Sequence, residues 1–432
     1  VGSEINVYFA NDLGKAFATL YPGEIVIGYD VRRESPELAK AFAEGVISTG
    51  SKVIDIGFAS TPLVAFATRF FCYDAGVSVT ASHLGSEYAG FKFYDENAVA
   101  ISYERGMRKI EETFHKQNFA VGKGTTIKRE VINEYIRYIF HKLKIARDDF
   151  AVAIDCMRGV MGLIAPVCLR EVCEELKKLR CDASGEFDGA PDPSQEENLE
   201  VLKEAVKENG LEVGFAYDGD GDRLAVIDDK GEVVPPTIVF ALLIENEFGS
   251  DGDGKKVVVD VLTSDVIVDS IKRVGAIPIV CRVGHTYIMD RMFREGATLA
   301  GELSGHYYFR QMFGLDDALF ASLKLLEFLS RKKQRLSELR KRIKLPFLKK
   351  ERVRIKEGEK HKFVEKLRER FEKLGYEMET IDGIKLRVRD GWICVRASNT
   401  EEKITIVYEG KTKSAFKKLE NLANEIKSEI PQ

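Results

Sequence analysis

Apolar runs that end in a polar residue recur along the chain and predict a repeated strand–helix–strand unit. The first run, Glu24–Asp30, has the form of a buried strand ending in aspartate, and Phe150–Asp155 and Val257–Asp260 repeat it. Each run is followed by a stretch with helical periodicity and then by a second apolar run. This order favours right-handed βαβ units with a mostly parallel sheet. The pattern therefore predicts three similar α/β domains.

The boundaries inside these units follow from local signals. In the first unit the pattern predicts a helix over Glu37–Ser48, capped by Ser35, and then a strand over Lys52–Gly57. In the second unit it predicts a helix over Leu163–Leu179 and a strand near Cys181. Each unit also has a later strand that runs into a polar loop containing Gly or Ser. Such loops are where α/β proteins bind ligands.

The last part of the chain has a different composition. Lys and Arg are dense over residues 330–357, which we interpret as a solvated helix end and an interdomain linker. A helix over His361–Leu374, several short strands and a final helix over Lys413–Ile430 predict a small α+β domain. We therefore expect four domains, over residues 1–124, 125–229, 230–345 and 346–432.

The composition excludes several classes of function. A chain of 432 residues favours three or four domains. A net charge of −4 gives no bulk attraction to nucleic acid or to an anionic membrane, and no apolar run approaches membrane-spanning length. The seven cysteines form no Cys-x-x-Cys pair, which favours a reducing, cytoplasmic setting. We expect a cytoplasmic monomer or homodimer that acts on small molecules.

One acidic loop is a candidate metal site. Asp218, Asp220 and Asp222 alternate with glycines, and Arg223 follows directly. In an extended backbone alternate side chains project to one side, so the carboxylates can converge on a hard cation such as Mg²⁺ or Ca²⁺. A solvated turn is the alternative. An EF-hand calcium loop is excluded, because its required Gly and Glu positions hold Arg223 and Asp229.

The loop after the third predicted strand contains Ser82 in the run Thr80-Ala81-Ser82-His83. A serine at this place is a candidate nucleophile, but it is also typical of a turn or a helix cap. The nucleophile elbow Gly-x-Ser-x-Gly is absent. His83, as the immediate neighbour, is poorly placed to act as a triad base.

A later loop carries groups that suit sugar hydroxyls. Glu302, Ser304 and His306 alternate, so an extended loop would offer an acceptor, a hydroxyl and an imidazole from one side. The alternative is a polar turn between a strand and a helix. His285 is a candidate for a further hydroxyl or phosphate contact, although a lone histidine is more often structural.

A loop near the end of the chain suits a phosphate dianion, because it combines cationic side chains, hydroxyls and turn amides. A capped tight turn is the alternative. The candidate residues are Arg396, Ser398, Asn399, Thr400 and Lys403.

Taken together, these loops resemble those of one family, the α-D-phosphohexomutases, which include phosphomannomutase/phosphoglucomutase. Thr80–His83 is similar to the family's phosphoserine loop, Asp218–Arg223 to its metal loop, Gly301–His306 to its sugar loop and Arg396–Glu401 to its phosphate loop. The four motifs follow the family's order and span nearly the whole chain. The resemblance implies three α/β domains and a smaller fourth domain around a central cleft.

The resemblance also implies a mechanism. Ser82 would carry a phosphoryl group, and Mg²⁺ would be held by a phosphoserine oxygen and by Asp218, Asp220 and Asp222. Phospho-Ser82 would convert a mannose or glucose monophosphate into a hexose 1,6-bisphosphate. This intermediate would reorient in the cleft and return its other phosphate to Ser82. Lys92 aligns with the proposed general acid/base. The implied catalytic residues are Ser82, His83, Lys92 and Arg223.

The chain departs from the family pattern in four places, which include Met157-Arg158 in place of the common Gly-Asn and Glu402 where Pro often stands. Leu84-Gly85 replaces the usual Asn-Pro after His83. The family's Arg-containing N-terminal arm is absent, and because the chain begins at Val1 we interpret this as a truncation.

Three alternatives to a mannose/glucose mutase remain open. Phosphoglucosamine mutases of the family usually carry Gln where this chain has Leu303. A metal-dependent sugar-phosphate phosphatase would use an Asp nucleophile and would not need Ser82. A non-catalytic sugar-phosphate-binding protein would need no working serine loop.

Overall fold

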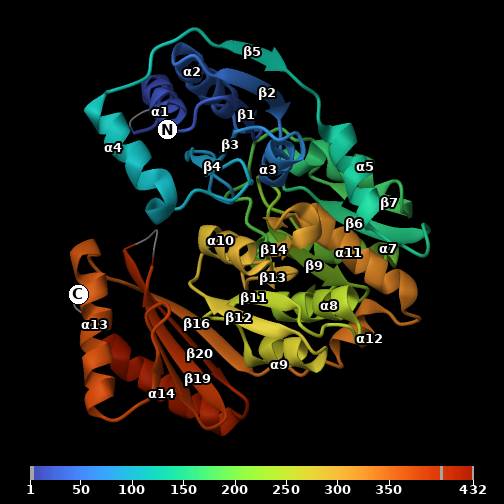
Figure 1. The fold of residues 1–432 in the computed structure, drawn as a ribbon. Helices are drawn as coiled ribbons and strands as arrows, with labels where there is room; N and C mark the ends of the chain where they lie inside the picture. The colour runs from blue at the N-terminus through green and yellow to red at the C-terminus, as the bar shows by residue number, and fades with distance from the viewer. Residues whose placement is uncertain (1–3, 399–401, 431–432) are drawn as a thin grey trace.

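The computed structural model describes residues 4–398 and 402–430. Four five-stranded sheets follow one another along the chain. In Figure 1 the first lies at the top, the second on the right, the third near the centre, and the fourth at the lower left. The first three sheets are mixed and the fourth is antiparallel. The predicted fold class, three α/β units and a smaller α+β domain, is confirmed.

The first four strands of each of the first three sheets share one arrangement, as the repeated sequence pattern predicted. The first strand lies between the second and third and is parallel to both, and the fourth pairs antiparallel with the third. The fifth strand pairs with the second in the first sheet and with the fourth in the other two. The first sheet contains β1 (Glu24–Tyr29), β2 (Lys52–Phe58), β3 (Ala75–Val79), β4 (Phe91–Tyr94) and β5 (Thr125–Lys128). The second contains β6 (Phe150–Asp155), β7 (Cys173–Leu179), β8 (Val213–Tyr217), β9 (Leu224–Asp228) and β10 (Val233–Val234). The third contains β11 (Lys256–Asp260), β12 (Ile277–Cys281), β13 (Leu299–Gly301), β14 (Tyr307–Phe309) and β15 (Leu315–Asp316).

Helices cover these sheets, which explains why strands such as β3 are apolar and buried along their whole length. Within the described residues, no helix is long and apolar enough to cross a membrane. The helices of the first unit are α1 (Val7–Leu20), α2 (Ser35–Ser48), α3 (Thr61–Phe70) and α4 (Arg108–Lys116), and those of the second are α5 (Ile132–Lys142), α6 (Ala165–Leu169) and α7 (Glu200–Asn209). The third has α8 (Pro236–Phe248), α9 (Asp265–Arg273), α10 (His285–Glu295), α11 (Ala318–Arg331) and α12 (Leu336–Arg340).

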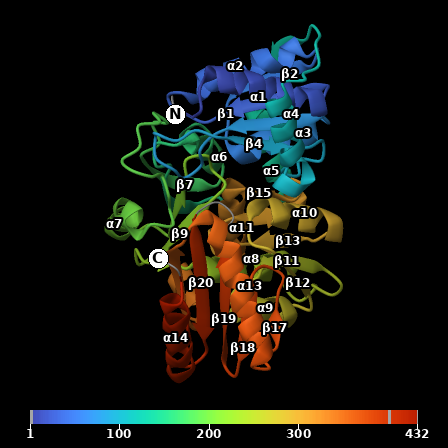
Figure 2. The same ribbon diagram turned by 90° about the vertical axis from the view of Figure 1, so that its left-hand side faces the viewer.

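The fourth sheet has its own core under α13 (Glu357–Lys373) and α14 (Lys413–Ser428) (Figure 2). A separate apolar cluster joins Trp392, Cys394 and Val407 of this sheet to Val261 and Leu262 of the third unit. One face of the fourth sheet therefore packs on its helices and the other faces the third unit. Its strands, in spatial order, are β16 (Phe347–Arg354), β20 (Lys403–Gly410), β19 (Gly391–Ala397), β18 (Ile384–Val388) and β17 (Met378–Glu379).

The long helix predicted over Leu163–Leu179 is wrong, and so is the strand near Cys181. The helix α6 ends at Leu169, and Cys173–Leu179 forms the edge strand β7, parallel to β6. The Glu and Lys residues of this segment have good helix propensity. However, β6 has backbone groups on this side that need partners, so strand pairing outweighs the local preference.

Two further local predictions are corrected. Ser35 does not cap its helix; it is buried, and its hydroxyl donates to Asp30 Oδ1 at 2.6 Å. The predicted linker contains the strand β16, which pairs with β20 along its whole length. Because many of its Lys and Arg side chains are exposed, the sequence of β16 resembles that of a solvated linker.

Candidate active site

The serine loop follows β3 and is held by a buried ion pair. Ser82 has a φ of +50°, a left-handed conformation that is costly for a residue other than glycine. Its N–H donates to Thr80 Oγ1 at 2.8 Å, and Thr80 Oγ1 donates to Asp30 Oδ2 at 2.7 Å. Asp30 in turn accepts from Arg32 Nε at 2.9 Å, and both side chains are buried. The loop conformation is therefore imposed by groups outside it.

Arg32 also explains how the loop is held without the usual Asn-Pro. Its guanidinium donates to the carbonyl oxygens of Ser82, Leu84 and Gly85, the first two at 2.7 Å. Five N–H donors in a rigid fork make arginine suited to several acceptors at once. Sequence reasoning missed Arg32. The available signal was an arginine two residues after an aspartate that ends a buried strand.

The acidic loop follows β8, and its three carboxylates are buried. Asp218 Oδ1 accepts from the backbone N–H groups of Gly221, Asp222 and Arg223 at 3.0–3.2 Å, which fixes the turn. Its other oxygen, Oδ2, lies 3.2 Å from Ser82 Oγ. Burial, followed by the charges of Asp222 and Asp220, raises the pKa of Asp218 well above its usual value.

Lys92, on β4, compensates the other two carboxylates. Its Nζ lies 2.7 Å from Asp220 Oδ2 and 2.5 Å from Asp222 Oδ2. Burial lowers the pKa of Lys92, but Asp220 and Asp222 outweigh it and hold the pKa well above its usual value. For Asp222, burial by itself raises the pKa, but the charges of Lys92 and then His306 bring the pKa well below its usual value. Lys92 is thus an ammonium that bridges two carboxylates.

The acidic loop fits a divalent cation. Asp218, Asp220 and Asp222 each offer an oxygen within 4.8 Å of the others'. Asp220 Oδ1 is buried and has no hydrogen-bond partner in the described structure, so it has a lone pair to spare. All donors are carboxylate oxygens, which suit Mg²⁺. The site stays a candidate on these grounds.

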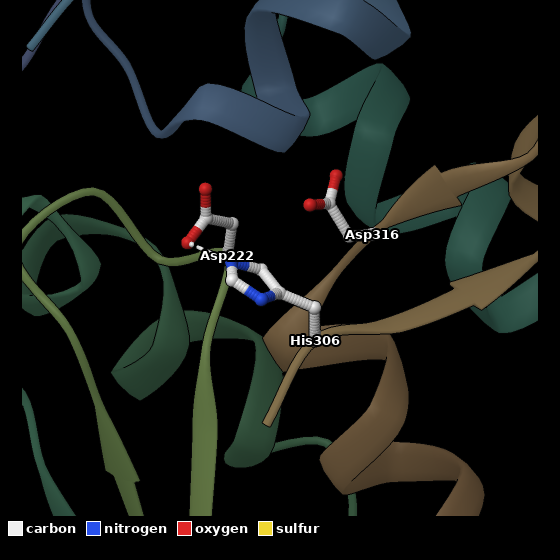
Figure 3. Close-up of side chains that lie close together, drawn as sticks. All are labelled: Asp222, His306 and Asp316. Carbon is white, nitrogen blue, oxygen red and sulfur yellow. Dashed lines mark ion pairs between the residues drawn. The ribbon is translucent and has the colours of Figure 1, made fainter. Parts of the chain in front are cut away.

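The sugar loop is a tight turn between β13 and β14, so the alternative of a turn between a strand and a helix is wrong. Ser304 Oγ lies 2.7 Å from both Glu302 Oε2 and His306 Nδ1. His306 Nε2 lies 3.2 Å from Asp222 Oδ1 (Figure 3). Despite burial, Asp222 and Glu302 raise the pKa of His306 to about 10, and His306 and Ser304 lower that of Glu302 to about 2. His306 therefore links the sugar loop to the acidic loop as an imidazolium.

His285 and Arg223 also contribute to this part of the site. His285 begins α10, and its Nδ1 lies 2.6 Å from Asp316 Oδ2 at the end of β15. Asp316 lies beside His306 in Figure 3. Arg223 is mostly buried, with Asp192 Oδ1 3.6 Å from its Nη1. Asp192 was not among the predicted residues.

The predicted phosphate loop is described only in part. Arg396, at the end of β19, is buried and donates from Nε to Asp382 Oδ2 at 2.8 Å, while its Nη2 has no hydrogen-bond partner among residues 4–398 and 402–430. Ser398 receives a cross-strand contact, its N–H donating to the carbonyl of Lys403 at 2.9 Å. Asn399 and Thr400 lie outside the described residues.

One cavity of about 560 Å³ collects side chains from all four units. Asp218 and Asp220 lie buried behind it, and Lys403 does not line it. The predicted residues that do line it are Ser82, His83, Lys92, Asp222, Arg223, His285, Glu302, Ser304, His306, Arg396 and Ser398. Loops far apart in the sequence therefore meet in one cleft.

Comparison with known proteins decides the family. The phosphoglucomutase/phosphomannomutase alpha/beta/alpha domains I, II and III match residues 1–121, 133–231 and 236–345, and the C-terminal domain matches residues 351–426. A protein of Thermococcus kodakarensis named phosphoglucomutase/phosphomannomutase is 32% identical over 423 residues, covering 95% of this chain and 92% of its own. The chain belongs to the phosphoglucomutase/phosphomannomutase family. The resemblance inferred from the four motifs is confirmed.

Other family members show how far this identification reaches. A crystal structure of a family protein from Burkholderia thailandensis has a TM-score of 0.90 at 27% identity and covers 99% of this chain and 94% of its own. A Methanosarcina barkeri protein named "Probable phosphoglucosamine mutase" is 34% identical over 392 residues, covering 89% of this chain and 87% of its own. The chain is a sugar-phosphate mutase of the phosphohexomutase type, and relatives named for different hexoses match it equally well.

The acidic loop gives the first testable prediction. Adding MgCl₂ should stabilise the wild-type protein against thermal unfolding, by about 2.7 kcal/mol at a hundred times the dissociation constant. Asp220→Ala should abolish this stabilisation, because it removes one of the three carboxylates that would bind the ion. Asp251→Ala, in an exposed Asp/Gly turn, is the matched control. Equal stabilisation of the Asp220→Ala variant and the wild type would contradict the assignment.

Proposed function

We propose that the protein interconverts the 1- and 6-phosphates of mannose and glucose through phospho-Ser82 and a hexose 1,6-bisphosphate. The observation that carries this proposal is the position of Ser82 Oγ, 3.2 Å from Asp218 Oδ2 in a cleft that also contains the sugar loop. A serine beside buried acidic groups is suited to holding a phosphoryl group next to a metal ion. Mg²⁺, held by Asp218, Asp220, Asp222 and a phosphoserine oxygen, would neutralise the charge of the transferring phosphoryl group.

The side chains of the cleft have separate tasks in this proposal. Glu302 is ionised and Ser304 is hydrogen-bonded to it, so both can bind sugar hydroxyls. Lys92 would act as the general acid/base: once Asp220 and Asp222 are committed to a cation, Lys92 loses two counter-charges and its pKa falls. Arg223 and His83 would contact the reacting phosphate, and His285 the sugar or its phosphate.

The end of the substrate that does not react would be held by the fourth unit. Arg396 Nη2 is buried and has no hydrogen-bond partner in the part of the chain that the structure describes, and Ser398 lines the same cavity as Arg396. Asn399, Thr400 and Lys403 complete the phosphate loop that the motif predicts. The bisphosphate would exchange its two ends between this loop and Ser82.

Two measurements test the proposal. Mass spectrometry of the purified protein should find one phosphoryl group on the peptide that contains Ser82. A coupled assay, primed with glucose 1,6-bisphosphate, should show mannose and glucose 1-phosphates converted to 6-phosphates. Release of inorganic phosphate in place of the isomer would instead indicate a phosphatase.

A phosphoglucosamine mutase is the second candidate, favoured by the similarity to the Methanosarcina barkeri protein. The same assay with glucosamine 1-phosphate distinguishes the two. A kcat/KM for glucosamine 1-phosphate above that for both neutral sugars would replace the first assignment.

A further inference from the structure

The strand β16 brings a second set of cations to the phosphate end of the cleft. Lys350 and Arg352 line the same cavity as Ser82, Glu302 and Arg396. They lie in the segment that the sequence pattern assigned to a linker, and they do not belong to the predicted phosphate loop. Their position follows from strand register.

Register places these side chains on one face of the fourth sheet. Arg352 pairs with Thr405 of β20, and Thr405 pairs with Arg396 of β19. Directly paired residues share a face, and residues two apart on a strand share it as well. Lys350 therefore lies on the face of Arg352 and Arg396, which is the face turned to the cleft.

The intervening residues of β16 confirm this alternation. Lys349 Nζ lies 3.4 Å from Glu351 and 3.6 Å from Glu420 of α14, so both β16 side chains point to the helix-covered face. Lys349 and Lys350 are neighbours with the same side chain and opposite surroundings. The chain thus supplies a matched control for any role of Lys350.

Three cationic side chains, those of Lys350, Arg352 and Arg396, line the same end of the cavity. Burial, followed by the charge of Arg352, lowers the pKa of Lys350, and Asp260 and Glu302 offset this only in part. Arg396 Nη2 is buried and has no hydrogen-bond partner within the described segments of the chain. Clustered cations around an unpaired buried donor are suited to a dianion.

We propose that Lys350 and Arg352 of β16 bind the non-reacting phosphate of the sugar substrate together with Arg396. This inference rests on the proposed function and adds to it a recognition strand outside the phosphate loop. Charge-assisted hydrogen bonds from two further cations would hold the substrate while its other end reacts at Ser82. The strand would act in binding and not in the chemical step.

Calorimetric titration with glucose 6-phosphate and with inorganic phosphate tests this inference. Lys350→Ala and Arg352→Ala should each weaken glucose 6-phosphate binding by about tenfold, and Lys349→Ala should leave it unchanged. In the mutase assay KM should rise while kcat changes little. Both side chains keep solvent-accessible surface in the cleft, so their removal should leave the fold intact, which circular dichroism checks.

The outcomes separate this inference from the proposed function. If the wild type turns over hexose phosphates and Lys350→Ala binds as tightly as Lys349→Ala, the role of β16 is wrong and the mutase assignment stands. If the wild type binds glucose 6-phosphate but does not isomerise it, and the β16 variants bind more weakly, the mutase assignment is wrong and the role of β16 stands. If the wild type binds neither glucose 6-phosphate nor inorganic phosphate, the role of β16 is overturned.

An independent observation concerns two cysteines at the ends of β6 and β7. Cys156 directly follows β6, and its N–H donates to the carbonyl of Leu179, the last residue of β7. Cys181 follows two residues later, and the two Sγ atoms are 3.0 Å apart. Neighbouring strands lie about 4.8 Å apart, which is within the Cα separation that a disulfide bridges.

The two thiols differ in reactivity. Cys156 is fully buried, and burial raises its pKa well above the usual value. Cys181 is only partly buried, and its hydrogen bond with Cys156 lowers its pKa. Because the thiolate is the reactive form, Cys181 is the thiol that a peroxide meets first.

We propose that Cys156 and Cys181 form a reversible disulfide when the protein meets a peroxide. Cys181 Sγ attacks a peroxide oxygen and becomes a sulfenic acid, with one water released from hydrogen peroxide. Cys156 Sγ then attacks this sulfur, the S–S bond forms, and the hydroxyl leaves as a second water. Two thiols and one peroxide thus yield one disulfide and two waters.

Peptide mapping after treatment with hydrogen peroxide tests the pair. The wild type should yield one linked peptide containing Cys156 and Cys181, lose the two titratable thiols of this pair, and recover both with dithiothreitol. Cys181→Ser should give no such peptide, whereas Cys173→Ser, at the start of β7, should behave as the wild type. A wild-type protein with no linked peptide at full oxidation of the exposed Cys72 would overturn the proposal.

Discussion

Ser82→Ala is expected to lower kcat/KM for hexose 1-phosphate conversion by at least about 10³-fold, the scale on which removal of a catalytic nucleophile acts. The substitution removes the Oγ that lies beside Asp218 and that receives the phosphoryl group in the proposed cycle. Binding of hexose phosphates should remain, because the sugar loop and the fourth sheet are untouched. The phosphoryl mass on the Ser82 peptide should disappear with the activity.

Ser86→Ala is the matched control, because Ser86 is an exposed serine in the same loop. It should retain both the activity and the phosphoryl group. A Ser82→Ala variant that isomerises hexose phosphates at the normal rate would show that the phosphoryl group travels by another route.

Arg32→Ala should be the most damaging change outside the cleft. It removes the donor of three carbonyl hydrogen bonds in the serine loop and leaves Asp30 buried without its partner. Breaking a buried ion pair in this way costs about 3–5 kcal/mol of folding free energy. A displaced serine loop should also lower kcat by about 10²-fold, because small errors in position are costly in catalysis. Thermal unfolding and the coupled assay measure the two effects.

Two variants make the role of Arg32 testable even if Arg32→Ala folds poorly. Arg32→Lys keeps the charge beside Asp30 but cannot reach three carbonyls from one planar fork. It should therefore fold better than the alanine variant and still show low kcat and little phosphorylation of Ser82. Arg33→Ala, at the exposed neighbouring position, should match the wild type. Normal kcat in Arg32→Lys would exclude a positioning role.

The repeat of α/β units could be predicted from the sequence because a strand that is buried on both faces forms a continuous run of apolar residues. Runs such as Phe150–Asp155 are apolar wherever helices cover both sides, so they are found at the predicted places. A strand at the edge of a sheet has no such continuous apolar run. The segments that form β7 and β16 carry Lys, Glu and Arg on exposed positions, and both were assigned to other structures.

The candidate site divides in the same way. Asp218, Asp220 and Asp222 could be predicted because residues close in sequence create the cluster, and the turn is closed by hydrogen bonds within it. Lys92 entered only through resemblance to a family, whereas residue types alone made the loops containing Glu302 and Arg396 candidates for sugar and phosphate binding. Local spacing alone left each of these loops as open to a structural role as to a functional one.

By itself, the sequence determined the three repeated units, the small α+β fourth domain and the acidic loop, because each depends on residues that are neighbours along the chain. Only the tertiary structure decided what those loops meet. Arg32 holds a loop about fifty residues away, His306 links Glu302 to Asp222, and strand register places Arg352 on the same sheet face as Arg396. These contacts form between segments that are far apart in the sequence and are brought together by packing. They therefore produce no local or periodic pattern of residues from which they could be predicted.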